Sequence, residues 1–226
     1  MQQPTYIIDF DSTIVRVEGL EELARIALRG QPDRAAVMDR LQALTDHAMA
    51  GHIPVDQALR QRLELFKPNK YHLAELKDHL LHQITPSVWE HRAWLTYNAS
   101  RIYVLSGGFE EFIVPVVARL GLPADHVLAN AFELNADGDI VGHDTSRHTS
   151  RAGGKVLQVA DLQLPRPVIV IGDGYTDYEI KARGQADEFW AFCENVNRPN
   201  VAARADRVLT SFSQVVRDDP LLQPTA

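Results

Sequence analysis

The chain has 226 residues, and 45% of them are hydrophobic, which is enough for one well-buried core. The formal net charge of −7 excludes a general nucleic-acid binder, because binding to a phosphate backbone needs clustered Lys and Arg side chains. The single cysteine, Cys193, excludes a disulfide within the chain, and no segment approaches the roughly 18 apolar residues that a membrane span needs. We therefore expect a cytoplasmic protein, monomeric or homodimeric, that binds neither nucleic acid nor membranes.

Three short apolar runs predict buried parallel strands, at residues 5–9, 101–106 and 167–173. They are rich in β-branched residues and do not alternate with polar ones, as is typical of strands covered on both faces. The second and third runs each lead into a glycine-containing loop and then a helical pattern. This repeated order predicts an α/β fold with a doubly wound, Rossmann-like parallel sheet. A hairpin and two further strands are predicted at 132–144, 188–192 and 207–212.

The segment between the first and second strands follows a different pattern. Four stretches between residues 17 and 85 have apolar residues at helical spacing, and none of them has the pattern of a strand. We interpret residues 16–85 as a small, all-helical cap domain inserted after the first strand. Residues 1–15 and 86–226 would then form the α/β core domain.

Carboxylates follow two of the predicted strands. Asp9 and Asp11 end the first, and Asp173 and Asp177 follow the third. Taken singly, each has a plain structural explanation, as a turn cap or a solvated acid in a first helical turn. Together they converge, because the carboxyl ends of parallel strands meet at one edge of the sheet. Converging carboxylates repel one another unless a cation binds them, and a set of oxygen ligands suits Mg²⁺.

The second strand leads into Ser106-Gly107-Gly108. A hydroxyl followed by two glycines lets backbone N–H groups approach an oxyanion just before a helix, although a tight turn would explain the same residues. Lys155 stands at the start of a later helix. An isolated lysine is usually a solvated side chain, but here it supplies the positive charge that a cluster of acids and phosphate needs. These residues predict a site for a small phosphorylated metabolite.

The order of these motifs resembles the haloacid dehalogenase-like hydrolase superfamily, and within it the phosphoserine phosphatases. DFDSTIVRVE, SGGF, a glycine–lysine loop and GDGYTD stand in the superfamily's order over nearly the whole chain. The helical segment after DFDST is similar to the small cap domain of that subfamily. The resemblance implies a Mg²⁺-dependent phosphomonoester hydrolase that acts through an aspartyl-phosphate, with O-phospho-L-serine as substrate and a place in serine biosynthesis.

The resemblance also implies residue roles. Asp9 would be the nucleophile that attacks phosphorus. Asp11 would protonate the leaving alcohol and later help to activate water. The implied Mg²⁺ ligands are Asp9, the backbone carbonyl of Asp11, and Asp173, with Asp177 behind them. The residues implied in binding the phosphate are Ser106, Gly107, Lys155 and Thr176.

Substrate choice would come from the cap and the residues that lead into it. Glu18 stands where the resemblance implies binding of the substrate's ammonium group, and Arg62 where it implies binding of the carboxylate. The planar guanidinium suits a carboxylate because the two can form parallel hydrogen bonds. Arg60 is the alternative to Arg62.

Two positions depart from the subfamily's pattern. Thr176 stands where those phosphatases usually have Asn, and Lys155 comes two residues after the usual lysine, so that Arg151 is an alternative to it. Other functions stay open at this point: hydrolysis of another small phosphomonoester, phosphoryl transfer to an alcohol by a phosphotransferase or phosphomutase, or a regulatory module that binds Mg²⁺ without catalysis.

Overall fold

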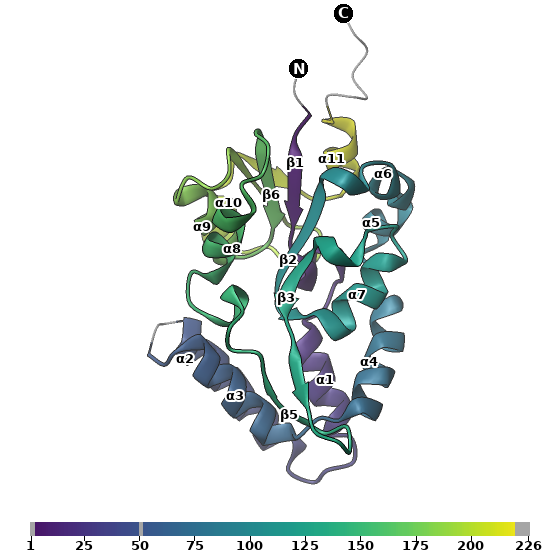
Figure 1. Cartoon of the computed structure of the whole chain (residues 1–226), viewed down its shortest axis with the longest axis vertical. Coiled ribbons are helices and arrows are strands. Elements are labelled where there is room, and N and C mark those ends of the chain that lie inside the picture. Colours follow the sequence, from purple (N-terminus) through teal and green to yellow (C-terminus); the bar gives the residue numbers. More distant parts are fainter. Residues whose placement is uncertain (1–2, 50–51, 220–226) are drawn as a thin grey trace, which may run out of the picture.

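The computed structural model describes residues 3–49 and 52–219. A six-stranded sheet lies at its centre, with the order β3-β2-β1-β6-β7-β8 and all neighbouring strands parallel (Figure 1). The chain winds outward from β1 to the β3 edge and then returns beside β1 to build the other edge. The predicted doubly wound α/β sheet is confirmed. Its strands are β1 (Thr5–Ile8), β2 (Ile102–Phe109), β3 (Val127–Asn130), β6 (Val168–Gly172), β7 (Glu188–Phe192) and β8 (Arg207–Leu209).

Helices cover both faces of the sheet, as the alternating side chains of β1 illustrate. Ile7 packs in one buried cluster with α8 (Gly154–Leu162) and α9 (Tyr175–Ala182). Ile8 packs in the opposite cluster with α7 (Glu110–Ala118). Burial on both faces accounts for the continuous apolar runs along the central strands. The shorter helices are α5 (Pro86–Glu90), α6 (Arg92–Tyr97) and α11 (Ser213–Arg217) on the α7 side, and α10 (Pro199–Ala202) on the α8 side.

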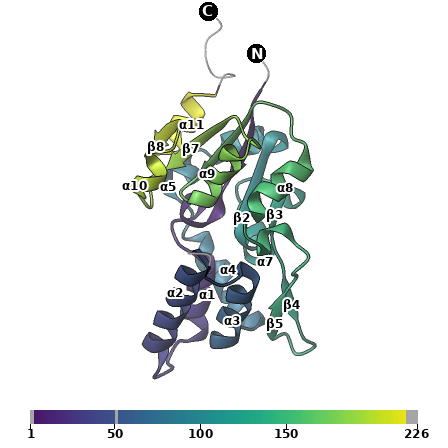
Figure 2. The same cartoon turned by 90° about the vertical axis from the view of Figure 1, so that its left-hand side faces the viewer.

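Four helices lie beyond the carboxyl end of β1, in the lower part of both views (Figures 1 and 2). The two chain segments that lead to and from them run side by side, with an antiparallel bridge between Val15 and Ile84. The predicted all-helical character of this segment is confirmed in its described residues, whereas its division from the core at residues 16 and 85 stays a prediction. Residues 50–51 of the predicted cap, and 1–2 and 220–226 of the predicted core, lie outside the described residues. The helices are α1 (Gly19–Ala27), α2 (Arg34–Met49), α3 (Val55–Phe66) and α4 (Lys70–Leu81).

The predicted hairpin consists of β4 (Phe132–Leu134) and β5 (Ile140–His143), and it reaches the helical segment. The N–H of Ile140 donates to the carbonyl of Pro68 at 3.0 Å, and the N–H of Lys70 donates to the carbonyl of Gly138 at 2.8 Å. The core therefore contacts the helical segment at the hairpin as well as at the paired segments near Val15.

Three details differ from the sequence-based expectation. β2 continues through the Ser-Gly-Gly motif to Phe109 rather than ending at Ser106, with an irregular register against β3. β3 itself was not predicted, and β8 ends at Leu209 before the chain turns into α11. In the part of the chain that the structure describes, no helix combines the length and the apolar character needed to cross a lipid bilayer.

Candidate active site

The segment after β1 turns sharply and places Asp9 at the end of the strand. Ser12 takes a left-handed conformation, with φ of 55°, within the turn Phe10–Ile14. Asp9 is 8% exposed, and its Oδ1 accepts a hydrogen bond from the N–H of Phe10 at 2.8 Å. The side chain of Asn195 donates to the carbonyl of Ser12 at 3.1 Å and so fixes the turn from outside. The Asp9 carboxylate therefore has a defined orientation at the strand end.

Asp11 lies two residues further on, between the core and α1. Its Oδ1 accepts a hydrogen bond from the N–H of Gly19 at 2.7 Å, and its Oδ2 accepts one from the hydroxyl of Ser106 at 3.3 Å. Loss of solvent, reinforced by the negative charges of Glu18 and Asp9, raises the pKa of Asp11 well above its ordinary value. A raised pKa favours the protonated carboxyl, which is the form that can donate a proton.

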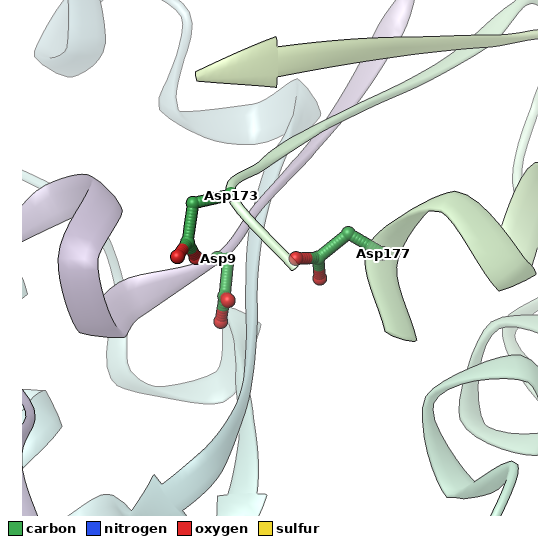
Figure 3. Close-up of side chains that lie close together, drawn as sticks. All are labelled: Asp9, Asp173 and Asp177. Atoms are coloured by element: carbon green, nitrogen blue, oxygen red, sulfur yellow. The ribbon is translucent and has the colours of Figure 1, made fainter. Parts of the chain in front are cut away.

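Asp173 and Asp177 arrive from β6 and the first turn of α9. Asp177 reaches back toward the strand and accepts a hydrogen bond from the N–H of Gly174 at 3.1 Å. A Cβ at Gly172 would collide with the Asp177 carboxylate, so this position needs glycine. Oxygen atoms of Asp9, Asp173 and Asp177 lie within 4.8 Å of one another. Figure 3 shows these three side chains gathered at the ends of their strands and the start of the helix.

Lys155 joins this cluster from the first turn of α8. Its Nζ lies 2.9 Å from Oδ1 of Asp9 and 2.8 Å from Oδ1 of Asp177. Burial alone would lower the pKa of Lys155, but the carboxylates of Asp177 and Asp9 raise it above its ordinary value, so the amine stays charged. Arg151, the alternative candidate, is exposed and donates to the carbonyl of Thr145 at 2.9 Å. The structure brings Lys155, and not Arg151, into contact with the acids.

Two cations, Lys155 and Arg198, contact the cluster of three buried acids. Arg198, in the loop before α10, pairs with the carboxylate of Asp173, a contact that sequence analysis missed. Burial, followed by the charge of Asp9, raises the pKa of Asp177 to about 7 despite the neighbouring Lys155. The three buried carboxylates offer oxygen atoms alone as ligands. Such a set fits a hard divalent cation such as Mg²⁺.

The Ser-Gly-Gly motif is braced on two sides. Ser106 is fully buried, and its Oγ accepts a hydrogen bond from the N–H of Gly108 at 2.9 Å. The carbonyl of Gly107 accepts one from the side chain of Asn130 at 2.8 Å, and Asn130 in turn accepts one from Thr149 at 2.9 Å. The peptide between the two glycines is therefore held from both ends, next to the acids. The role of Asn130 could not be predicted from the sequence, because this residue reaches Gly107 only through the pairing of β3 with β2.

Glu18 and Thr176 lie at the margins of this site. Glu18 is exposed and directly precedes α1, where its Oε1 accepts a hydrogen bond from the hydroxyl of Ser12 at 2.6 Å. Thr176 is half-buried in the first turn of α9, next to Asp177 in the chain. Glu18 is thus hydrogen-bonded to the turn that contains Asp11. Thr176 lies near the site because it precedes Asp177 in α9.

Arg62 faces α1 from α3. Its Nη2 lies 2.5 Å from Oε1 of Glu21, and its side chain is 13% exposed. Its Nε is buried, and none of the described residues accepts a hydrogen bond from it. Arg60 is exposed and lies 4.0 Å from Asp56 on its own helix. Arg62 therefore points into the helical segment toward α1, and Arg60 points to solvent. Glu21 was not identified from the sequence, since its partner is 41 residues away in the chain.

Comparisons with known proteins agree with this geometry. Residues 7–180 match the model of the haloacid dehalogenase-like hydrolase family. The chain is 35% identical over 211 residues to the chloroplastic phosphoserine phosphatase of Arabidopsis thaliana, covering 92% of this chain and 69% of that protein. It is 32% identical to the phosphoserine phosphatase of Homo sapiens, covering 92% and 89%. The solved structure of a phosphoserine phosphohydrolase-like protein from Francisella tularensis superposes with a TM-score of 0.81 at 27% identity, covering 97% of this chain and 100% of that one.

Proposed function

The chain belongs to the haloacid dehalogenase-like hydrolase family, and we propose that it hydrolyses O-phospho-L-serine with Mg²⁺ as cofactor. It is a phosphoric monoester hydrolase similar to phosphoserine phosphatases. The observation that carries the proposal is the contact of one lysine, Lys155, with both Asp9 and Asp177 at the carboxyl edge of the sheet. A fixed carboxylate beside a buried ammonium and further acids suits attack on an anionic phosphate.

Asp9 is the proposed nucleophile. Its carboxylate oxygen attacks phosphorus, the bond from phosphorus to the serine oxygen breaks, and an aspartyl-phosphate forms on Asp9. Asp11, whose raised pKa favours the protonated form, gives its proton to the departing serine oxygen. Asp11 then accepts a proton from water as the water attacks phosphorus. The bond to Asp9 breaks, and inorganic phosphate leaves.

The phosphate needs positive charge and hydrogen-bond donors, because an anionic nucleophile must approach it. At about 4 Å and an effective dielectric near 20, each pair of unit charges repels by roughly 4 kcal/mol. We assign Lys155, the hydroxyl of Ser106 and the N–H of Gly107 to the phosphoryl oxygens. The hydroxyl of Thr176 would donate one further hydrogen bond, in place of the amide that the resemblance implies at that position.

Asp9, Asp173 and the backbone carbonyl of Asp11 would hold Mg²⁺, with Asp177 behind them. When bound, the cation would neutralise charge on the carboxylates and on the phosphoryl oxygens. The support is the cluster of three buried carboxylates and the raised pKa of Asp177, both of which favour a further positive charge.

Selection of phosphoserine would rest on its ammonium and carboxylate groups. We assign the ammonium to Glu18 and the carboxylate to Arg62, whose buried Nε–H is not bonded by any residue that the structure describes. Both residues belong to the segment 16–85, which we propose to be a separate cap domain over the acids. The cytoplasmic location and the monomeric or dimeric state expected from the sequence stay predictions.

Phosphate release from a panel of phosphomonoesters, with Mg²⁺ and after its removal by chelation, tests the proposal. We expect O-phospho-L-serine to give the highest kcat/KM and chelation to abolish turnover. A higher kcat/KM for another metabolite would replace phosphoserine as the substrate. Phosphate release that requires an added alcohol acceptor would identify a phosphotransferase instead.

A further inference from the structure

The ion pair between Glu21 and Arg62 joins two helices of the segment 16–85. Glu21 lies in the first turn of α1, two residues after Gly19, whose N–H binds the Asp11 carboxylate. Arg62 lies on α3, and Nη2 of its guanidinium is 2.5 Å from Oε1 of Glu21. The contact therefore links Arg62 to the helical turn that binds Asp11, the residue proposed to act first as the acid and then as the base.

The pair is partly removed from solvent and incompletely satisfied. The side chain of Arg62 is 13% exposed and that of Glu21 is 25% exposed. The Nε of Arg62 is buried and has no hydrogen-bond partner in the described part of the chain. A buried donor without a partner costs free energy unless a ligand or water satisfies it. A substrate carboxylate would satisfy it and could form two parallel hydrogen bonds with the guanidinium.

Orientation matters because an arginine side chain has several rotatable bonds. Fixing such a side chain costs conformational entropy. If Glu21 orients Arg62 before substrate arrives, that cost does not fall on the binding step. The negative charge of Glu21 also offsets the partly buried charge of Arg62, so the arginine can stay in the site without a ligand.

We propose that Glu21 is a positioning residue for specificity, which holds the guanidinium of Arg62 ready to bind the substrate's carboxylate. The proposal rests on the function proposed above, in which Arg62 binds that carboxylate. Glu21 itself would not touch the phosphate or the reacting atoms.

Three substrates separate positioning from a merely structural role. O-Phospho-L-serine has both an ammonium and a carboxylate, O-phosphoethanolamine lacks the carboxylate, and p-nitrophenyl phosphate lacks both. For Glu21→Gln we expect KM for phosphoserine to rise about tenfold, with kcat retained, because one charge-assisted hydrogen bond to the arginine is weakened. KM for the other two substrates should stay within about twofold of the wild-type value.

Glu22→Gln is the matched control. Glu22 neighbours Glu21 on α1 but pairs with Arg25 at 3.2 Å and His79 at 3.1 Å. The control should leave the selectivity for phosphoserine over phosphoethanolamine unchanged. The double variant Glu21→Ala/Arg62→Ala should be no worse on phosphoserine than Arg62→Ala alone, because Glu21 acts through Arg62. Thermal unfolding of each variant reports on folding separately.

The outcomes are distinguishable. Equal KM changes for all three substrates, or additive losses in the double variant, would show a structural role and overturn the inference for Glu21 alone. An unchanged selectivity in Glu21→Gln would do the same. A wild-type enzyme without preference for phosphoserine over phosphoethanolamine would overturn the proposed role of Arg62, and the inference with it.

Discussion

Nζ of Lys155 lies 2.9 Å from Asp9 and 2.8 Å from Asp177, so a single ammonium connects the end of β1 with the first turn of α9. The lysine reaches this position although it stands two residues later than the resemblance implies. Gly153, with φ of 68°, turns the chain immediately before α8, and Lys155 then falls in the first turn of that helix. The contact makes Lys155 the central cation of the proposed site.

Replacement of this lysine should slow the chemical step. We expect Lys155→Ala to lower kcat by about 10²–10³-fold, because one preorganised donor to the developing charge is lost. Arg151→Ala is the control, since Arg151 donates to the carbonyl of Thr145 and not to the acids. Steady-state phosphate release measures both. A larger loss in Arg151→Ala than in Lys155→Ala would reverse the assignment.

Removal of the proposed nucleophile should abolish turnover. Asp9→Asn replaces the attacking carboxylate with a neutral amide, and we expect no phosphate release and no covalent label from a radioactive phosphate donor. Asp125→Asn, an exposed acid remote from the cluster in the chain, should retain both signals. Labelling of the Asp9→Asn protein would place the covalent intermediate elsewhere.

Arg62→Ala should impair phosphoserine selectively. Loss of a bidentate contact with a carboxylate is expected to raise KM for phosphoserine by about a hundredfold and to leave p-nitrophenyl phosphate unaffected. Arg60 lies on the exposed face of the same helix, so Arg60→Ala should leave KM unchanged for both substrates. A comparable rise for both substrates in Arg62→Ala would mean that this arginine does not bind the carboxylate.

The metal-free protein should lose stability as the pH rises. Burial, then the charge of Asp9, raises the pKa of Asp177 from 3.8 to about 7, so the folded state binds a proton that the unfolded chain has released. This stabilisation is fully present below about pH 4 and is lost as the pH rises through about 7. We expect Tm in a chelator to fall between about pH 4 and pH 7 and to level off above that, and Asp177→Asn to flatten the slope. An equal slope in the variant would assign the pH dependence to other groups.

Asn130 should matter through the glycine peptide that it holds. Asn130→Ala leaves the carbonyl of Gly107 and the buried hydroxyl of Thr149 without their partner, which is expected to cost about 1–3 kcal/mol of unfolding free energy. We also expect kcat to fall about tenfold, because the phosphate-binding turn is less well oriented. Urea unfolding and kinetics test the two effects. Asn135→Ala, in the exposed hairpin turn, is the control.

Much of the fold could be predicted because its signals are local. The continuous apolar runs at β1, β2 and β6 and the helical spacing of α1 to α4 lie within single elements. β3 was not predicted because its four residues are too few to show a periodic pattern. The extension of β2 to Phe109 escaped because glycines usually end a strand, whereas here pairing of Phe109 with Asn130 maintains it.

The order of the motifs along the chain is sufficient to predict that Asp9, Asp11, Asp173 and Asp177 arrive at one edge of a parallel sheet. Each of these acids lies at or shortly after the end of a predicted strand, and the carboxyl ends of parallel strands meet at one edge of the sheet. Only the packed fold shows which side chains meet across elements: Lys155 rather than Arg151 with the acids, Glu21 with Arg62, Asn130 with Gly107, and Arg198 with Asp173. These contacts join residues far apart in the chain, so they depend on how helices and strands pack and not on any local pattern.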